Sequence, residues 1–240
     1  MFFEIFLKNF AEGKHIAYSQ HFQKGKAMKG VTFGSLHSYT EWGLILTEKE
    51  IKSPKAKTKE VDIAGSDGVL DYTEYFGGVK YENRQMSFRF FKMNIVPDGF
   101  LALFSVVQNA LHGKKLKIVL DDDPAHYYIG RVSVNEWKSN KRLGEITIDV
   151  DAEPYKYNAA ETVITQAVSG TAPMILTNSK MPVVPTITTT AAMTIAFGGY
   201  SVEAKAGTFR IPELQLAEGQ TAVTVTGEGS ITFRYRQGSL

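Results

Sequence analysis

The sequence predicts a mainly β protein in two parts, the first with a single helix and the second built only from strands. Short runs of alternating polar and apolar residues recur along most of the chain, which is typical of half-buried strands. Only the segment around residues 97–113 has the i, i+3, i+4, i+7 spacing of an amphipathic helix. Charged residues become sparse after about Asn158, where threonine, valine, isoleucine and alanine dominate. A domain boundary is therefore expected there.

Composition narrows the classes of function. The chain has 240 residues, enough for one large domain or two ordinary ones. Its formal net charge is +2 with no long run of one sign, so neither nucleic-acid binding nor attraction to an anionic membrane is indicated. The absence of cysteine excludes disulfides, thiolate zinc sites and cysteine nucleophiles, and it fits a reducing compartment. No apolar run approaches the roughly 20 residues that span a bilayer, so membrane insertion is not expected.

The first residues are apolar but do not form a secretory signal. Glu4 and Lys8 interrupt the segment MFFEIFLKNF, and no small-residue cleavage site follows it. A more regular pattern begins at Met28, just after a Lys-Gly-Lys triplet of the kind that a translated ribosome-binding site would encode. Two interpretations stay open. Residues 1–27 are either an extension that precedes the natural start at Met28 or a genuine N-terminal arm.

The elements of the first part are expected in the following order. Strands cover residues 35–51 (SLHSYTEWGLILTEKEI) and 84–93 (RQMSFRFFKM), where aromatic and aliphatic residues alternate with polar ones. A helix follows, with Pro97 and Asp98 at its start and Gly113 at its end. Its apolar stripe consists of Phe100, Leu103, Phe104, Val107 and Leu111.

Two further strands are expected after the helix. Residues 114–134 (KKLKIVLDDDPAHYYIGRVSV) predict a hairpin whose Asp-rich turn and Pro124 separate the strands. Residues 145–157 (EITIDVDAEPYKY) continue the sheet until Pro154 ends it. Beyond them, short β-prone runs separated by Gly, Pro or Asn recur about every 8 to 12 residues, the spacing of an antiparallel sandwich.

Residues 61–91 gather acids, a serine and glycines, yet they match no reactive motif. Three aspartates there could suggest a calcium loop: Asp62, Asp67 and Asp71. The pattern fails because Ala64 and Ser66 occupy the ligand positions. Ser66 lies in AGSDG rather than in G-x-S-x-G, so a hydrolase nucleophile is disfavoured. Gly65 and Gly68 suit a turn, and the segment is interpreted as architecture rather than as a reaction centre.

The remaining candidates for chemistry are equally weak. A cation could be held by aspartates of the hairpin and the next strand: Asp121, Asp122, Asp123, Asp149 and Asp151. Successive strand residues face opposite sides, so this set is not expected to converge. The histidines are scattered and complete no triad: His15, His21, His37, His112 and His126. GKKL at Gly113 lacks the pattern of a phosphate loop. No catalytic residue, metal site or cofactor is predicted.

A series of segments is more specific than any of these motifs. It consists of GVTFGSLHSYTEWGLILTEKEI, VDIAGSDGVLDYTEYFGGVKYENRQMSFRF, LHGKKLKIVLDDDPAHYYIGRVSV, DAEPYKY, MPVVPTIT and IPELQLAEGQ. Its most distinctive positions are Trp42-Gly43-Leu44, Asp67-Gly68, Asp71, Arg84, Gly113-Lys114-Lys115, Asp122-Asp123-Pro124 and Glu153-Pro154-Tyr155. From about Met28 to Leu240 the chain resembles the distal tail protein (Dit) family of long, non-contractile-tailed phages and prophages of Gram-positive bacteria.

The resemblance implies a structural protein and not an enzyme. It implies an N-terminal tail-tube-like β-sandwich with one α-helix and a protruding hairpin over residues 28–157, which assembles as a hexameric ring. A galectin-like β-sandwich over residues 158–240 is expected on its outside. The implied role is a hub at the distal end of the tail, in the tail tip or baseplate, which joins the tail tube protein, a tail-associated hub protein and the host-adsorption apparatus. A receptor-binding protein is a further candidate partner. The implied location is the virion, assembled in the bacterial cytoplasm.

Two other classes of function were weighed against this one. A carbohydrate-binding module acting in recognition of the host cell surface is the main alternative, and a tail-associated hydrolase is the other. Trp42, Trp137 and all five histidines precede the second part of the chain, which leaves no tryptophan there to stack on a sugar. Tyr200, beside two glycines, is the residue best placed to present an exposed ring to a glycan.

Overall fold

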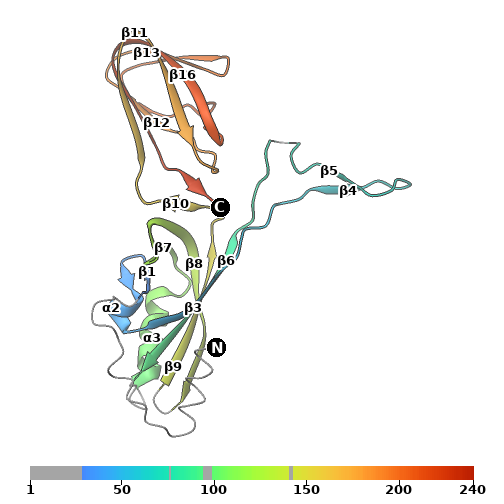
Figure 1. Ribbon diagram of the computed structural model, residues 1–240, viewed down its shortest axis with the longest axis vertical. Helices are drawn as coiled ribbons and strands as arrows, with labels where there is room; N and C mark the ends of the chain where they lie inside the picture. Colours follow the sequence, from blue (N-terminus) through green and yellow to red (C-terminus); the bar gives the residue numbers. More distant parts are fainter. Residues whose placement is uncertain (1–28, 76, 94–98, 141–142) are drawn as a thin grey trace.

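The computed structural model describes residues 29–75, 77–93, 99–140 and 143–240. Within these residues the chain forms two bodies, one above the other in Figure 1, and a narrow ribbon that leaves the lower body near the boundary between them. The mainly β fold predicted from the sequence is confirmed. Residues 1–27, the candidate start Met28, Pro97 and Asp98 lie outside the described residues, as do His15 and His21.

The first body contains a large antiparallel sheet. Its strands run in the order β2-β1-β7-β8-β9-β6-β3. They are β1 (Val31–Phe33), β2 (Leu36–His37), β3 (Ile45–Ile51), β6 (Arg84–Met93), β7 (Lys115–Leu120), β8 (Asp123–Asn140) and β9 (Leu143–Ala152). β7 and β8 are the two strands of the hairpin expected over residues 114–134. Alternating burial, most regular in β9, directs one face of the sheet into a shared core.

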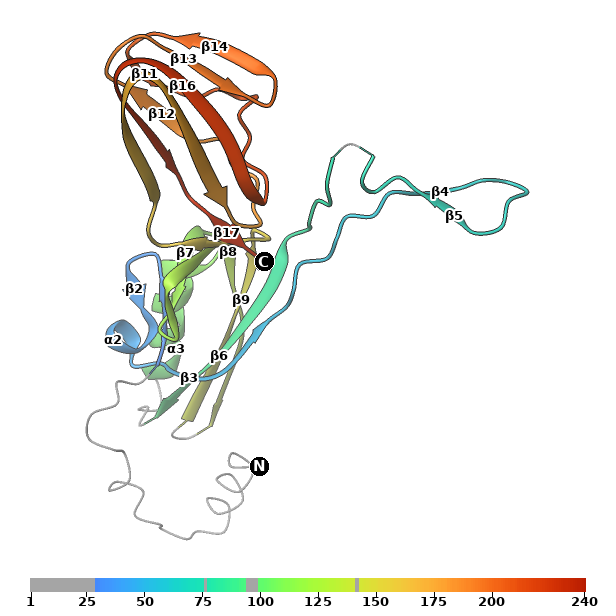
Figure 2. The same ribbon diagram turned by 45° about the horizontal axis from the view of Figure 1, so that its top comes forward.

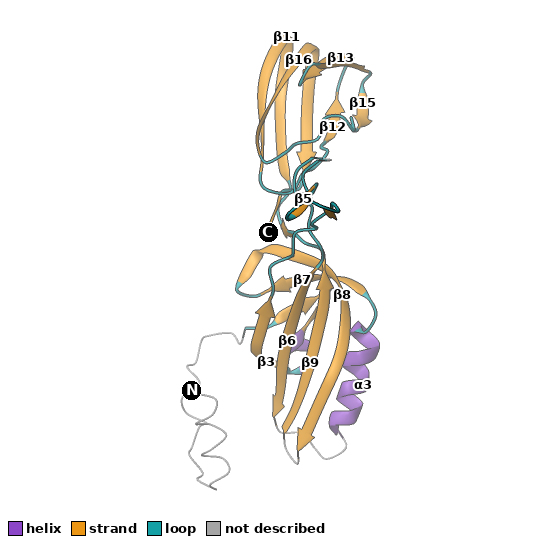
Figure 3. Cartoon of the chain, turned by 90° about the vertical axis from the view of Figure 1, so that its right-hand side faces the viewer, coloured by secondary structure: helices purple, strands orange, loops and turns teal. Residues whose placement is uncertain are grey.

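Helix α3 (Gly99–Leu111) covers one face of this sheet, as Figure 3 shows. The predicted helix and its apolar stripe are confirmed, with Phe100, Val107 and Leu111 buried. The Phe100 ring lies directly over Gly144 of β9, where an added Cβ would come within 2.0 Å of the ring. Glycine at this position is therefore required by the close approach of the helix to the sheet.

A second, short helix corrects the sequence prediction. Residues 35–51 were expected to be strand, and the fold was expected to contain one helix, but Ser38–Trp42 form helix α2. The N–H of Thr40 donates to His37 Nδ1 at 3.2 Å, and Gly43 ends the helix in the left-handed region with φ 62°. Capping at both ends thus outweighs the β propensity of this aromatic segment.

The second body is built from strands alone within residues 159–240. Its sheet contains β11 (Thr162–Asn178), β12 (Thr186–Thr189), β13 (Met193–Phe197), β14 (Tyr200–Ala204), β15 (Gly207–Phe209) and β16 (Gly219–Tyr235). β11 pairs with β16 over the full 17 residues of each strand. β16 also pairs with β13 through its first half and with β12 through its second half. This single strand therefore holds the sandwich together around a core of its own.

A small joint links the two bodies. β10 (Lys156–Asn158) pairs on one side with β8 of the first body and on the other with β17 (Gly238–Ser239), which follows the second body. The hydrophobic cores divide between Ala152 and Val168, on either side of this joint. The bodies are thus connected by backbone pairing as well as by the chain itself.

The ribbon carries the strands β4 (Glu60–Asp62) and β5 (Val69–Asp71), and Figure 2 shows it extending away from both bodies. We call residues 52–83 the arm. It corresponds to the protruding hairpin that the resemblance implied. None of the helices among the described residues is long and apolar enough to cross a membrane.

Candidate assembly interface

The arm is a two-stranded ribbon held together by backbone hydrogen bonds. Near the body, the N–H of Glu82 donates to the carbonyl of Lys55 and the N–H of Lys57 donates to that of Lys80, both at 2.8 Å. Farther out, the N–H of Tyr72 donates to the carbonyl of Lys59. Beyond this point β4 and β5 pair as far as a tip closed by Gly65 and Gly68, which both have positive φ. The predicted turn is confirmed at these two glycines.

Register gives the outer part of the arm two different faces. Val61 lies opposite Leu70, so these two side chains share one face of the ribbon. The other face carries Glu60 opposite Asp71 and Asp62 opposite Val69. Exposed apolar side chains continue along this part of the arm: Val61, Ile63, Val69, Leu70, Tyr72 and Tyr75. A two-stranded ribbon with its apolar side chains in water is marginally stable alone, so the arm has the character of a docking element.

The arm residues considered as reactive groups have structural roles or lie in the exposed turn between β4 and β5. Asp71 accepts a hydrogen bond from the N–H of Thr73 at 2.7 Å, and the side chain of Thr73 together with this N–H holds the pKa of that carboxyl below its ordinary value. Ser66 Oγ lies 3.4 Å from the carbonyl oxygen of Asp67. Asp62 lies on β4, apart from Asp67 in the turn between β4 and β5. The ribbon therefore presents neither an activated serine nor a calcium loop.

The three aspartates of the β7–β8 turn each contact different residues. Asp121 contacts His37 Nε2 at 3.0 Å and accepts from the N–H of Gly30 at 2.7 Å. Asp122 pairs with Lys49 of β3, and Asp123 pairs with His126 and Lys156. These contacts lower the pKa of Asp122 and Asp123, chiefly through the hydrogen bonds from Lys49 and His126 respectively. The turn therefore links β7 and β8 to β2, β3 and β10 through side-chain contacts.

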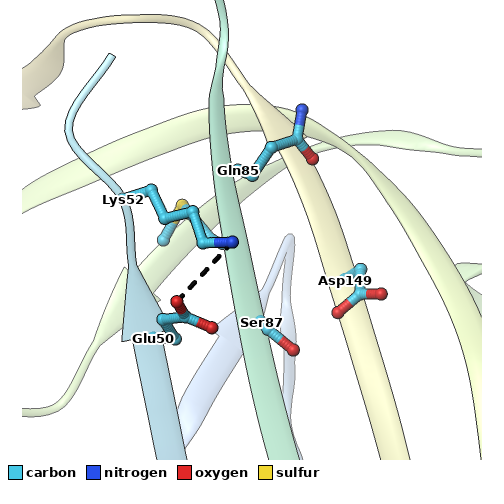
Figure 4. A pocket seen from close by; sticks show the side chains of 6 residues that line it. Glu50, Lys52, Gln85, Ser87 and Asp149 are labelled. Atoms are coloured by element: carbon cyan, nitrogen blue, oxygen red, sulfur yellow. Dashed lines mark ion pairs between the residues drawn. The ribbon is translucent and has the colours of Figure 1, made fainter. Parts of the chain in front are cut away.

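Asp149 and Asp151 lie on the polar face of the same sheet. Asp149 accepts from Asn135, and Asp151 accepts from Asn83 and Gln85. Figure 4 shows the hollow beside Asp149, which Glu50, Lys52, Gln85, Met86 and Ser87 also line; Lys52 Nζ lies 3.6 Å from Glu50 Oε1. Among the described residues, no group of three or more metal-ligating side chains converges. The five aspartates considered as a cation site are therefore not brought together.

The remaining candidates at helix α3 also support the scaffold. His112 Nδ1 accepts from the N–H of Val134 at 3.1 Å. Gly113 takes positive φ and donates its N–H to the carbonyl of Val132. Lys114 Nζ caps the end of the helix by donating to the carbonyls of residues 109 and 110. The interpretation of GKKL as a helix end is confirmed.

A network around Arg84 fixes the chain where it leaves the first body. Arg84 is 5% exposed, and its Nε and Nη2 donate to the carbonyl of Pro154 at 3.0 and 2.7 Å. Burial lowers the pKa of this guanidinium. Lys115 Nζ binds Glu153 at 2.6 Å, and the Tyr157 hydroxyl donates to the same carboxylate. Distinctive residues of the sequence, far apart along the chain, thus meet at the joint.

The joint also contains a stack of side chains from both bodies. The Tyr127 ring of β8 stacks on Tyr157 with 5.4 Å between centroids. Lys117 and Arg236 lie over the Tyr127 ring at 4.4 and 5.6 Å, and Arg236 donates to the carbonyls of Asn158 and Ala159. No local sequence pattern predicts this joint, because its partners are far apart in the chain, as Tyr127 and Arg236 show.

Tyr200, the candidate for sugar stacking, begins β14. Its ring is 57% exposed and stacks on Phe197 with 5.7 Å between centroids. A single exposed aromatic is smaller than the platforms of most sugar-binding sites.

No protein-family model matches the chain, and no curated protein matches it. Among solved structures, it is similar to SPP1 Dit (gp 19.1), which is described as a paradigm of the hub adsorption apparatus in phages that infect Gram-positive bacteria. The match covers 89% of this chain and 100% of SPP1 Dit, with 16% sequence identity and a TM-score of 0.67.

The chain has the Dit fold. The resemblance inferred from the sequence is confirmed at the level of architecture, since two β bodies and a protruding arm are all present. At this sequence identity the likeness establishes how the chain is folded. The distinctive positions of the Dit-like segments, from Trp42-Gly43-Leu44 to Glu153-Pro154-Tyr155, are used in caps, turns and the joint of this fold.

Proposed function

We propose that the chain is a structural hub protein of a phage tail, which forms a closed ring at the distal end of the tail tube. The observation that carries this proposal is the likeness to SPP1 Dit over 89% of the chain, together with an arm that extends away from both bodies and whose strands β4 and β5 form a sheet of their own. In this role the first body forms the ring and the second body, over residues 158–240, lies outside it. The virion tail tip would be its location after assembly in the host cytoplasm.

A ring follows from the kind of contact that the arm can make. The arm leaves one side of the body, and its contact with a second copy is heterologous if the part that docks differs from the surface that receives it. Such heterologous contacts close into a ring when the rotation between copies divides a full turn. Six copies are proposed, with the tail tube protein above and a tail-associated hub protein below. A receptor-binding protein is the proposed partner of the second body.

The structural role is also supported by what the candidate reactive groups do. Asp121, Asp122 and Asp123 tie strands together, and Lys114 caps a helix. These contacts give structural roles to residues that the sequence offered as candidates for a cation site or a phosphate loop.

The test is the mass and shape of the assembled protein. Native mass spectrometry and size-exclusion chromatography with light scattering should give a species of six times the 26.6 kDa chain mass, and negative-stain images should show a central hole. A chain that stays monomeric from micromolar to hundreds of micromolar, and that does not assemble with its tail tube and hub proteins, would contradict the proposal.

Carbohydrate binding is a second candidate function, favoured by the exposure of Tyr200 alone. The distinguishing experiment is a glycan array and a cell-wall binding assay with the full chain and with Tyr200→Ala. Under the structural proposal neither protein binds above background. Binding that is specific and is lost in the variant would favour the carbohydrate-binding module.

A further inference from the structure

The arm separates acidic and basic residues along its length. Residues 60–79 contain five acidic residues and no Lys or Arg, whereas residues 52–59 contain Lys52, Lys55, Lys57 and Lys59 and no acid. We call the outer part, residues 60–72, the tip, and the inner part, residues 52–59 with 79–83, the shaft. The tip of the arm is therefore acidic and the shaft is mostly basic.

The register within each part places like charges directly opposite each other. In the tip, Glu60 lies opposite Asp71. In the shaft, the bridge between Ala56 and Tyr81 sets Lys57 opposite Lys80, while Lys55 lies opposite Glu82. Like charges at directly opposed positions destabilise an antiparallel pair. The pair Glu60–Asp71 and the pair Lys57–Lys80 are thus each unfavourable alone, and each has the sign of charge that would relieve the other.

The two parts also match in the way their faces are arranged. On the tip, the face opposite the acids carries Val61, Ile63, Leu70 and Tyr72, all of them exposed. On the shaft, the face opposite the lysines carries Pro54, Ala56, Val79 and Tyr81. Tyr81 packs edge-on against Tyr155 of the joint at 6.1 Å, so the apolar face of the shaft is directed toward the body. Each ribbon is therefore apolar on one face and charged on the other.

We infer that the tip of one copy pairs edge to edge with the shaft of the next copy, which extends the proposed ring contact to particular residues and rests on that proposed function. β4 and β5 pair only with each other among the described strands, so the outer edges of the ribbon are available for strand addition. Side-by-side pairing brings Glu60 and Asp71 next to Lys57 and Lys80 on one face. On the other face it joins the two apolar rows into one continuous strip.

Stacking the ribbons face to face does not achieve the same result. If the apolar faces met, the acidic and basic rows would lie on opposite outer surfaces, and both like-charge repulsions would remain. If the charged faces met, the apolar side chains of the tip would stay in water. Pairing within one sheet brings the opposite charges together and gathers the apolar side chains on one shared face.

The inference is tested by reversing the charges of each part in the full chain. The tip variant is Glu60→Lys with Asp71→Lys, and the shaft variant is Lys57→Glu with Lys80→Glu. Each should weaken assembly at least about tenfold at low salt, because like charges then meet across the interface. The variant with all four changes should return to within about threefold of the original chain, because the signs are exchanged but remain complementary. Glu203→Lys with Lys205→Glu, on the exposed edge of the second body, is the matched control and should leave assembly unchanged.

Mixing the two defective variants gives the sharper test. In the tip variant the two opposed pairs, 60 with 71 and 57 with 80, are both basic, and in the shaft variant both pairs are acidic. An equimolar mixture should therefore form rings in which the two alternate, detected as a mixed species by native mass spectrometry. Circular dichroism of each variant alone should show unchanged strand content, which separates loss of contact from loss of folding.

The outcomes distinguish this inference from the proposed function. Rings of the original chain whose formation is unaffected by either reversal would overturn the pairing of tip and shaft and leave the ring itself standing. Reversed variants that fail alone and also fail when mixed would likewise overturn it. An original chain that never assembles would overturn both proposals.

Discussion

At the scale of single residues, the buried Arg84 shows how a charged side chain can hold the backbone of a distant segment in place. Two of its N–H groups bind one carbonyl, that of Pro154, and its guanidinium lies 5.3 Å from the centre of the Tyr128 ring. Pro154 has no N–H to donate, so its carbonyl is the group through which the backbone can be held at this point. Arg84 therefore fixes the direction in which the chain leaves the sheet.

Replacement of Arg84 by methionine should destabilise the protein by about 2 kcal/mol, because the Pro154 carbonyl then loses both charge-assisted donors in a buried site. Equilibrium unfolding in urea, followed by circular dichroism, measures the change. Arg89→Met is the control on the same strand. Arg89 pairs with Glu48 and Glu145 at 2.6 and 3.2 Å but is half exposed, so its loss should cost less than about 1 kcal/mol. Equal losses of unfolding free energy in the two variants would contradict this structural role of Arg84.

At the scale of elements, the sequence predicted what depends on local pattern. Alternation predicted β6, β9 and the β7–β8 hairpin, and 3.6-residue spacing predicted α3. Helix α2 was missed because its stability comes from two caps, His37 and Gly43, which compete with a strand-like composition. Periodicity reports the face of an element and not the hydrogen bonds at its ends.

The candidate interface was predictable only in part, for a related reason. The turn at Gly65 and Gly68 was visible in the sequence, and so was the interpretation of the segment as architecture. The two faces of the arm depend on cross-strand register, which places Glu60 opposite Asp71 and requires the exact pairing. The joint depends on contacts between residues tens of positions apart, such as Lys115 with Glu153. No local pattern contains that information.

The stability of the joint should decrease at acid pH, because the Glu153 carboxylate becomes protonated. Partial burial alone would raise the pKa of this carboxyl, but hydrogen bonds from Lys115 and Tyr157 outweigh burial and hold it below the ordinary value of 4.5. A depressed pKa means that the stabilisation is present above pH 4.5 and is lost as the pH falls through the folded-state pKa. Glu153→Gln should therefore lower the melting temperature at pH 7, and the difference from the original chain should shrink below pH 4.5.

Thermal melting at a series of pH values measures this effect. The exposed Glu203→Gln on β14 is the control and should change the melting temperature little at any pH. A difference for Glu153→Gln that stays constant from pH 7 to pH 3.5 would show that the carboxylate does not contribute through its charge.

At the scale of the whole molecule, two hydrophobic cores share one chain. One core draws its buried residues from Val31 to Ala152 and the other from Val168 to Tyr235. Separate cores are the usual mark of parts that can fold on their own. The boundary predicted after residue 157 falls within β10, the strand that both bodies share, so independence of the second body remains a prediction.

A fragment of residues 159–240 should fold alone, because every buried apolar residue of the second core lies within it. We expect a β-type circular dichroism spectrum and a single cooperative melting transition, at a lower temperature than in the full chain since β17 loses its partner β10. A fragment without dispersed amide signals in its NMR spectrum would show that the two bodies stabilise each other through the joint.

The long strand β16 has a consequence for the order of events during synthesis. It pairs with β11, β12 and β13, and Thr162 meets Tyr235 across 73 intervening steps of the chain. Until the ribosome has released β16, the earlier strands of this body have no central partner and their apolar faces stay unsatisfied. The second body should therefore close late and all at once, and chains stalled before residue 219 should be the ones that aggregate or recruit chaperones.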